Sequence, residues 1–142
     1  MYEPIRAKSV HTMAGGTADF PHRSREEELD IQLAGHLAAL LAVTDELRAT
    51  APSEDLDAAA ERLTAQVTRL RGGQSPARAS AAVAEPHLTE PHLAALHRRA
   101  HALAGRALVV AASRADTAAA ILAAERMDAH ARALEPRVAL QA

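Results

Sequence analysis

The sequence of 142 residues contains no cysteine. This absence excludes disulfide bonds, thiolate nucleophiles and zinc sites built from cysteine. The chain also lacks an excess of charge of one sign, because its formal net charge is only −2. A nucleic-acid footprint needs a basic excess, so the composition predicts no nucleic-acid partner.

Aromatic side chains are nearly absent as well. There is one tyrosine, Tyr2, one phenylalanine, Phe20, and no tryptophan. The core must therefore be built from leucine, valine, isoleucine, methionine and alanine. Small side chains remove little apolar area from water, at roughly 25 cal/mol per Å², so such a core is thin and would gain from a second subunit.

Long hydrophobic runs are missing too. The longest relevant uncharged stretch, Ile31 to Thr44, has 14 residues and contains His36, whereas a membrane-spanning helix needs about 20 apolar residues. The first residues hold no continuous apolar segment of the kind that signal peptides carry. We therefore expect a cytoplasmic protein with no membrane partner.

Leucine and alanine recur at helical spacing through most of the chain. Ser24-Arg25-Glu26-Glu27 is a capping box and predicts a helix that ends near Thr50. Ser53 can cap a second helix, which Gly72-Gly73 should end. The short connection between them predicts an antiparallel hairpin. The cleanest apolar seam lies in the second helix and consists of Leu56, Ala60, Leu63, Val67 and Leu70.

A third helix should begin near Thr89 or Glu90, with Pro91 in its first turn, where the missing N–H costs nothing. Two alternatives stay open beyond it. Ser113-Arg114-Ala115-Asp116 can be a second capping box that starts a fourth helix. One helix could instead continue from Arg106 to Glu135, because neither glycine nor proline interrupts that stretch.

The fold class that follows is all-α. We expect an antiparallel helical bundle of four helices, or of three with a long C-terminal helix. An irregular N-terminal arm should occupy residues 1–23, the bundle residues 24–136 and a C-terminal tail residues 137–142. On the bundle surface we expect an exposed ion pair between Asp128 and Arg132, one turn apart, and solvated arginines on the polar side of the second helix.

Half of the eight histidines lie within fifteen residues: His87, His92, His97 and His101. At about 100° per residue, His97 and His101 share one side of the third helix, flanking its apolar stripe. His36 points close to the centre of the apolar stripe of the first helix. A polar ring there needs a partner, so we interpret His36 as a core histidine bonded to a carboxylate or a backbone carbonyl.

A metal site is one hypothesis for these side chains. His97 and His101 form a His-x₃-His pair, and His36 could add a third ligand for zinc or another divalent transition metal. Further ligands could come from Glu125, Asp128 or His130. Di-iron bundles carry glutamates that are followed at the third position by histidine, and no glutamate of this sequence is. Our first expectation is therefore that the protein binds no cofactor.

Residues 100–112, with the sequence AHALAGRALVVAA, resemble the His-box of histidine phosphotransfer domains. That resemblance implies a helical bundle in which His101 accepts the phosphoryl group. It also implies that Gly105 is the small neighbour that leaves the ring accessible. The lysine that the family usually has three residues after the histidine is Ala104 here.

The first functional hypothesis is a non-catalytic interaction or regulatory module that forms a homodimer or packs on another helical protein. The thin core and the regular seam of the second helix favour it. The alternatives are a metal-binding or ligand-binding bundle that uses His36, His97 and His101, and phosphotransfer through His101. Full protonation of the histidines would move the formal net charge from −2 to +6, so association could depend on pH.

Overall fold

The computed structural model describes residues 23–79 and 89–136, which form an all-α bundle. Its four helices are α2 (Arg25–Thr50), α3 (Glu54–Leu70), α4 (Glu90–Ser113) and α5 (Thr117–Ala133). This confirms the predicted fold class. The expected arm, apart from Arg23, and the tail over residues 137–142 lie outside the described residues, as does His87. None of the described helices combines the length and apolar character that crossing a membrane requires.

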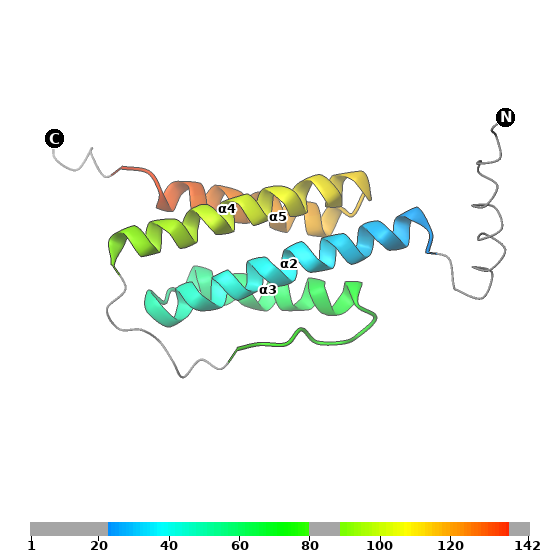
Figure 1. Cartoon of the computed structure of the whole chain (residues 1–142), viewed down its shortest axis with the longest axis horizontal. Coiled ribbons are helices and arrows are strands. Elements are labelled where there is room, and N and C mark those ends of the chain that lie inside the picture. Colours follow the sequence, from blue (N-terminus) through cyan, green and yellow to red (C-terminus); the bar gives the residue numbers. More distant parts are fainter. Residues whose placement is uncertain (1–22, 80–88, 137–142) are drawn as a thin grey trace, which may run out of the picture.

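The helices are arranged as two antiparallel hairpins. α2 packs on α3, α4 packs on α5, and the hairpins meet where α2 lies against α4; α3 lies beside α5 less closely. Figure 1 shows α3 and α4 running in the same direction, so the chain between them has to return along the bundle. The topology is that of a bundle with one long crossover connection.

The described part of this crossover is held against α2. Nε and Nη2 of Arg78 donate to the carboxylate of Asp45 at 2.7 and 2.8 Å, and Pro76 is buried. Burial alone would raise the pKa of Asp45, but hydrogen bonds from Arg78 and Arg48 lower it below its usual value.

The predicted N-terminal caps are confirmed. Oγ of Ser24 accepts from the backbone N–H of Glu27 at 3.1 Å, and the Glu27 carboxylate accepts from the N–H of Ser24 at 2.9 Å. Ser53 and Thr89 each accept from the third residue after them. Side-chain caps of this kind typically stabilise a helix by about 1 kcal/mol.

Gly72 and Gly73 end α3 as expected. Both have left-handed backbone angles, with φ of 69° and 101°. This conformation lets the N–H of Gly73 donate to the carbonyl of Thr68 at 2.8 Å and satisfy a group at the end of the helix.

The sequence left open whether α4 and α5 are two helices or one continuous helix. The chain between them shows that they are separate, so the prediction of a continuous helix is wrong. Ala115 has a φ of 57°, and the N–H of Asp116 donates back to the carbonyl of Ala111 at 2.9 Å. Asp116, not Ser113, caps α5 by accepting from Ala119 at 3.2 Å. The hydroxyl of Ser113 donates to the carbonyl of Val109 instead.

The core joins large and small side chains. α2 and α3 supply most of the fully buried leucines, whereas half of the residues that α4 and α5 bury are alanines. The alanines with no exposed surface are Ala100, Ala104, Ala107, Ala111, Ala119 and Ala123. Small residues on one hairpin leave room for the leucines of the other to pack against it.

Candidate functional site

Two imidazoles meet inside the α4–α5 hairpin. Nδ1 of His97 lies 2.9 Å from Nδ1 of His130, and the ring centroids are 5.2 Å apart. His130 is only 1% exposed, while His97 is partly buried. The separation fits an N–H···N hydrogen bond, so one ring donates and the other accepts.

Arg126 lies one turn before His130 on α5 and is also buried, with 4% of its side chain exposed. Its Nη1 lies 3.1 Å from the carboxylate of Asp55 on α3, and its Nη2 lies 3.4 Å from Nε2 of His130. Its Nε has no hydrogen-bond partner among the residues that the structure describes. A buried cation therefore has one carboxylate beside it and one imidazole.

The guanidinium fixes the tautomers of both rings. An arginine only donates, so Nε2 of His130 must accept from Arg126 and carry no proton. The proton of neutral His130 is then on Nδ1, which donates to Nδ1 of His97. His97 in turn carries its proton on Nε2. The result is a chain of hydrogen bonds from Asp55 through Arg126 and His130 to His97.

Burial and charge both keep these rings neutral. Burial is the largest cause that lowers the pKa of His130 to about 4, and the positive charge of Arg126 comes next. The carboxylate of Asp55 offsets part of this effect. Burial and then Arg126 also lower the pKa of His97. Both rings therefore stay neutral at pH 7 and take up no second proton. This agrees with the tautomers that the hydrogen bonds require.

His36 is not the core histidine that the sequence predicts. It is only partly buried, and its ring makes no hydrogen bond to any group in the described part of the chain. The buried stripe of α2 is centred on Leu37, between Leu33 and Leu41. One helical residue corresponds to about 100°, which puts His36 at the edge of the stripe.

The three histidines that were expected to share a metal form no metal-binding group in the part of the chain that the structure describes. Within residues 23–79 and 89–136 no three or more histidine, aspartate or glutamate side chains are grouped so that they could hold a metal ion. His97 instead contacts His130, which the sequence offered only as an additional ligand. The guanidinium of Arg126 beside His130 adds positive charge where a metal would bind.

His101 is partly buried on α4, and its charge also lowers the pKa of His130 slightly. A Cβ at Gly105 would come within 3.7 Å of the Met127 side chain on α5, so this glycine faces the neighbouring helix. Phosphotransfer through His101 stays a prediction.

Ion pairs join α3 to α5 where their packing is least close. Besides Asp55 and Arg126, Arg62 pairs with Glu125 at 2.7 Å and Arg69 with Asp116 at 2.8 Å. The sequence predicted a solvated face at these arginines unless a partner is acidic; both side chains are half exposed, and each has an acidic partner. An exposed pair such as Arg62 with Glu125 contributes about 0–1 kcal/mol.

Asp128 and Arg132 do not form the ion pair that their spacing predicts. No salt bridge joins them in the part of the chain that the structure describes. The carboxylate of Asp128 is exposed on α5.

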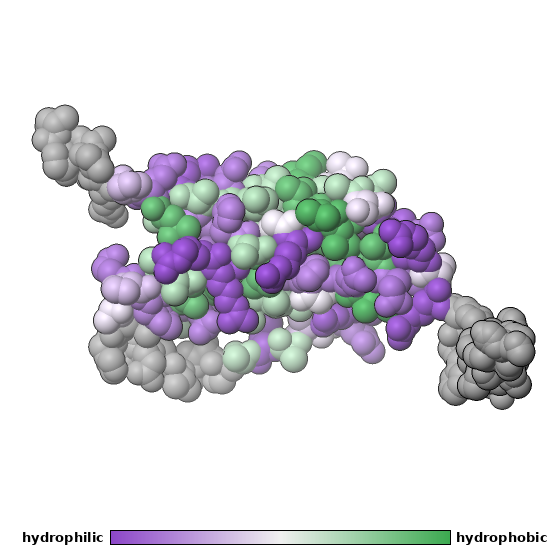
Figure 2. Space-filling view, turned by 45° about the horizontal axis from the view of Figure 1, so that its top comes forward, coloured by the Kyte–Doolittle hydropathy of each residue, from purple (hydrophilic) through white to green (hydrophobic). Residues whose placement is uncertain are grey.

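The surface of the α4–α5 hairpin is apolar near the turn between the helices. Val109 is 67% exposed and Ile121 is 51% exposed, although both are large hydrophobic residues. Between the helices lies a shallow groove of about 280 Å³. The residues lining the groove include Ala112, Ala120, Ile121 and Ala124. Figure 2 shows hydrophobic residues gathered on the upper part of the molecule, where α4 and α5 lie, between hydrophilic regions.

A larger hollow of about 560 Å³ lies between α2 and the crossover. Four of its five charged lining residues pair with one another, because Arg78 and Arg48 both bind Asp45, and Arg48 also binds Asp57; the fifth is Glu46. This hollow therefore offers few uncommitted groups to a ligand.

No protein-family model matches the chain, and no curated protein or solved structure is significantly similar to it. Its function must therefore be inferred from its own residues.

Sequence reasoning missed the cluster in which buried Arg126 and His130 meet the exposed carboxylate of Asp55. A signal was present: Ala119, Leu122, Arg126 and His130 recur at spacings of three or four, so the arginine and the histidine continue the apolar stripe of α5. A polar pair in such a stripe predicts a buried contact with a neighbouring helix.

Proposed function

We propose that the chain is a non-catalytic helical interaction module that self-associates, in its simplest form as a homodimer. The observation that supports it is the apolar surface at the end of the α4–α5 hairpin, where Val109 and Ile121 are both more than half exposed. Contiguous exposed apolar surface is typical of interaction sites, whereas single exposed hydrophobic residues are ordinary.

The energetics of the bundle favour such a partner. Burying a valine or isoleucine side chain fully gains about 1.5–3 kcal/mol, and here most of that gain is not realised within one chain. Six of the ten apolar residues that α4 and α5 bury in the core are alanines, which remove less apolar area from water than leucine does. A second copy would add apolar burial that the isolated bundle lacks. The cytoplasmic location expected from the sequence is part of the same proposal.

Sedimentation equilibrium of untagged protein tests this proposal over a wide range of concentrations. We expect the weight-average mass to rise from that of one chain to that of two chains as the concentration increases. A mass of one chain at every concentration would refute self-association. A chain that stays monomeric alone and forms a complex only with a different helical protein would refute it too.

A further inference from the structure

We infer that acid opens the bundle between α3 and α5, because a proton added to the His97–His130 pair drives the guanidinium of Arg126 away from His130. The two hairpins then turn about the contact between α2 and α4, and each hairpin stays folded. This inference goes beyond the proposed function and is independent of it, since every group that it uses belongs to one chain. It is drawn from the hydrogen bonds of the cluster and from the unequal packing of the helices.

The paired imidazoles have no free nitrogen that can accept a proton. Two neutral rings share four nitrogens and two protons. One proton lies between the two Nδ1 atoms, which are 2.9 Å apart, and the other is on Nε2 of His97. Nε2 of His130 accepts from Nη2 of Arg126 at 3.4 Å. Every ring nitrogen of the pair is therefore either protonated or engaged in a hydrogen bond.

A further proton has to break one of these hydrogen bonds. If it binds to Nε2 of His130, this N–H faces the N–H of Arg126, and a positive ring lies beside a positive guanidinium. If it binds to Nδ1 of His97, two N–H groups meet between the rings. If the proton of His130 then moves to Nε2, that N–H again faces Arg126. In each case the buried cation gains a second positive charge close by.

The other charges around His130 do not compensate for this repulsion. Among the described helices α5 contacts only α3 and α4, so these two supply the neighbouring groups. Arg126 on α5 itself disfavours the protonated ring most strongly, followed by His97 and then His101 on α4. The carboxylate of Asp55 on α3 favours the protonated ring. One carboxylate therefore faces several positive groups at acidic pH.

Relief of the repulsion requires water, and the nearest water is on the α3 side of the cluster. His130 is 1% exposed and the side chain of Arg126 is 4% exposed, so neither cation is hydrated where it lies. Two adjacent cations in the interior are costly. The side chain of Asp55, which binds Arg126, is 67% exposed. Separation of α3 from α5 lets the guanidinium follow this carboxylate into solvent and lets water reach the ring.

The contact between α3 and α5 is also the easiest to open. α4 and α5 pack most closely, and α2 packs closely on both α3 and α4, whereas α3 lies beside α5 less closely. Besides the pair of Asp55 and Arg126, two ion pairs with half-exposed arginines join α3 to α5. Exposed pairs contribute little. Opening at this contact leaves both hairpins and the α2–α4 contact in place.

Distances between spin labels test the opening, because the chain has no cysteine of its own and labels can be attached at chosen positions. Ala58→Cys with Ala131→Cys reports on α3 and α5. Ala102→Cys with Ala131→Cys reports on α4 and α5, and Gln32→Cys with Ala112→Cys on α2 and α4. All five side chains are exposed. Dilution with unlabelled protein restricts the measured distances to those within one chain.

Between pH 7 and pH 4 we expect the α3–α5 distance to lengthen and the other two distances to stay unchanged. The pKa of His130 is lowered to about 4 in the closed bundle, first by burial and then by Arg126, so opening should begin as the pH approaches this value. The far-UV circular dichroism should keep its helical signal. Lengthening of the α4–α5 distance, loss of helix, or no change in any distance would overturn the inference.

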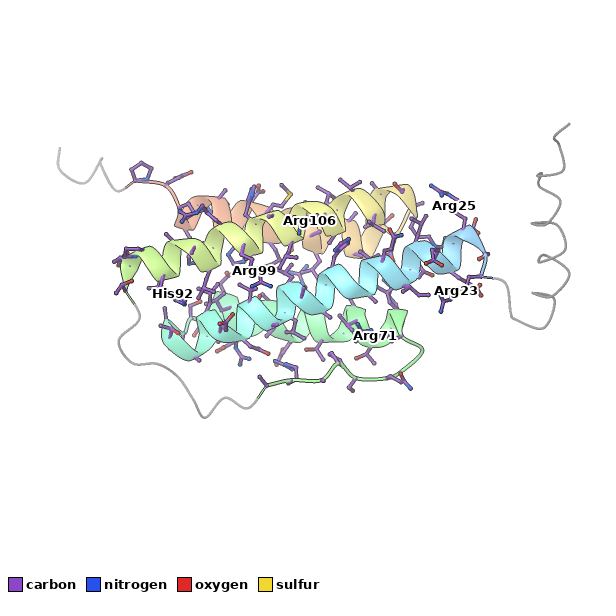
Figure 3. The ribbon with its side chains drawn as sticks, viewed as in Figure 1. Arg23, Arg25, Arg71, His92, Arg99 and Arg106 are labelled. Atoms are coloured by element: carbon purple, nitrogen blue, oxygen red, sulfur yellow. The ribbon has the colours of Figure 1, made fainter. Side chains whose placement is uncertain are left out.

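A matched pair of variants separates the imidazoles from the carboxylates of the ion pairs, which also take up protons near pH 4. His130→Gln keeps those carboxylates and should stay closed where the wild type opens. His92→Gln is the control and should open as the wild type does, because His92 is exposed at the start of α4 (Figure 3). If His130→Gln opens over the same pH range as the wild type, the inference is overturned.

A second measurement needs no change in the cluster and stands even if His130→Gln does not fold. NMR of the wild type follows the ring signals of His97 and His130 during the same titration. We expect one of these rings to take up its proton over the pH range in which the α3–α5 distance lengthens. Opening while both rings are still neutral would overturn the inference, and so would protonation of His130 with the distance unchanged.

Discussion

Replacing His130 by glutamine should remove most of the acid sensitivity of the bundle between pH 6.5 and pH 4. In the folded chain the pKa of His130 is lowered from 6.5 to about 4, first by burial and then by the charge of Arg126. The unfolded chain takes up this proton near pH 6.5, whereas the folded chain resists it until about pH 4. Stability is therefore complete above pH 6.5 and falls as the pH falls through this window.

The size of the effect follows from the shift. One pKa unit corresponds to 1.36 kcal/mol, so a shift of this size makes folding about 3 kcal/mol less favourable at pH 4 than at pH 7. His97 acts in the same direction, because its pKa is also lowered by burial and by Arg126.

Urea unfolding followed by far-UV circular dichroism measures this dependence. It should be done at one protein concentration, since self-association would shift the apparent stability. At neutral pH the His130→Gln variant loses the contacts with His97 and Arg126 and should be less stable than the wild type. That difference should shrink as the pH is lowered towards 4. His92→Gln, at an exposed position on α4, is the control and should follow the wild type. If His130→Gln loses stability with acid as steeply as the wild type, the reasoning is refuted.

Three further predictions concern the same cluster, the core and the turn. Arg126→Met should raise the pKa of His130, because it removes the charge that ranks second among the causes of the lowered value; an unchanged pKa in an NMR titration of the ring would contradict this. Leu63→Ala should cost about 2–5 kcal/mol in urea unfolding, since Leu63 is fully buried, whereas Ile121→Ala should leave the stability of the monomer nearly unchanged. Ala115→Gly should stabilise the fold by up to about 1 kcal/mol, because glycine adopts a φ of 57° without strain; a loss of stability would show that the turn does not strain the alanine.

The sequence predicted the parts of the fold that depend on local chemistry. The caps at Ser24 and Ser53 and the glycines after Leu70 act within one turn of helix, so their residue types are sufficient to predict them. The boundary between α4 and α5 was ambiguous because it depends on a left-handed alanine. Ala115 gives no signal of the kind that glycine gives, and its conformation is supported by the cap at Asp116 and the ion pair with Arg69.

The candidate site depends on the register between helices, which one sequence does not contain. His97 was recognised as one edge of a stripe, but its partner His130 follows it by 33 residues and is brought near only when α4 and α5 fold back on each other. The position of His36 was predicted wrongly, because its ring lies at the edge of the buried stripe and is only partly buried. The contact between His97 and His130 and the burial of His36 both depend on how the helices pack.

Hydrogen–deuterium exchange at low and high protein concentration tests the central claim most directly, because it reports which amides a second copy covers. The account predicts that concentrating the protein slows exchange over the last turns of α4 and the first turns of α5, around Val109 and Ile121, and leaves α3 unchanged. Exchange that does not respond to concentration, or slows only in α2 and α3, would contradict it.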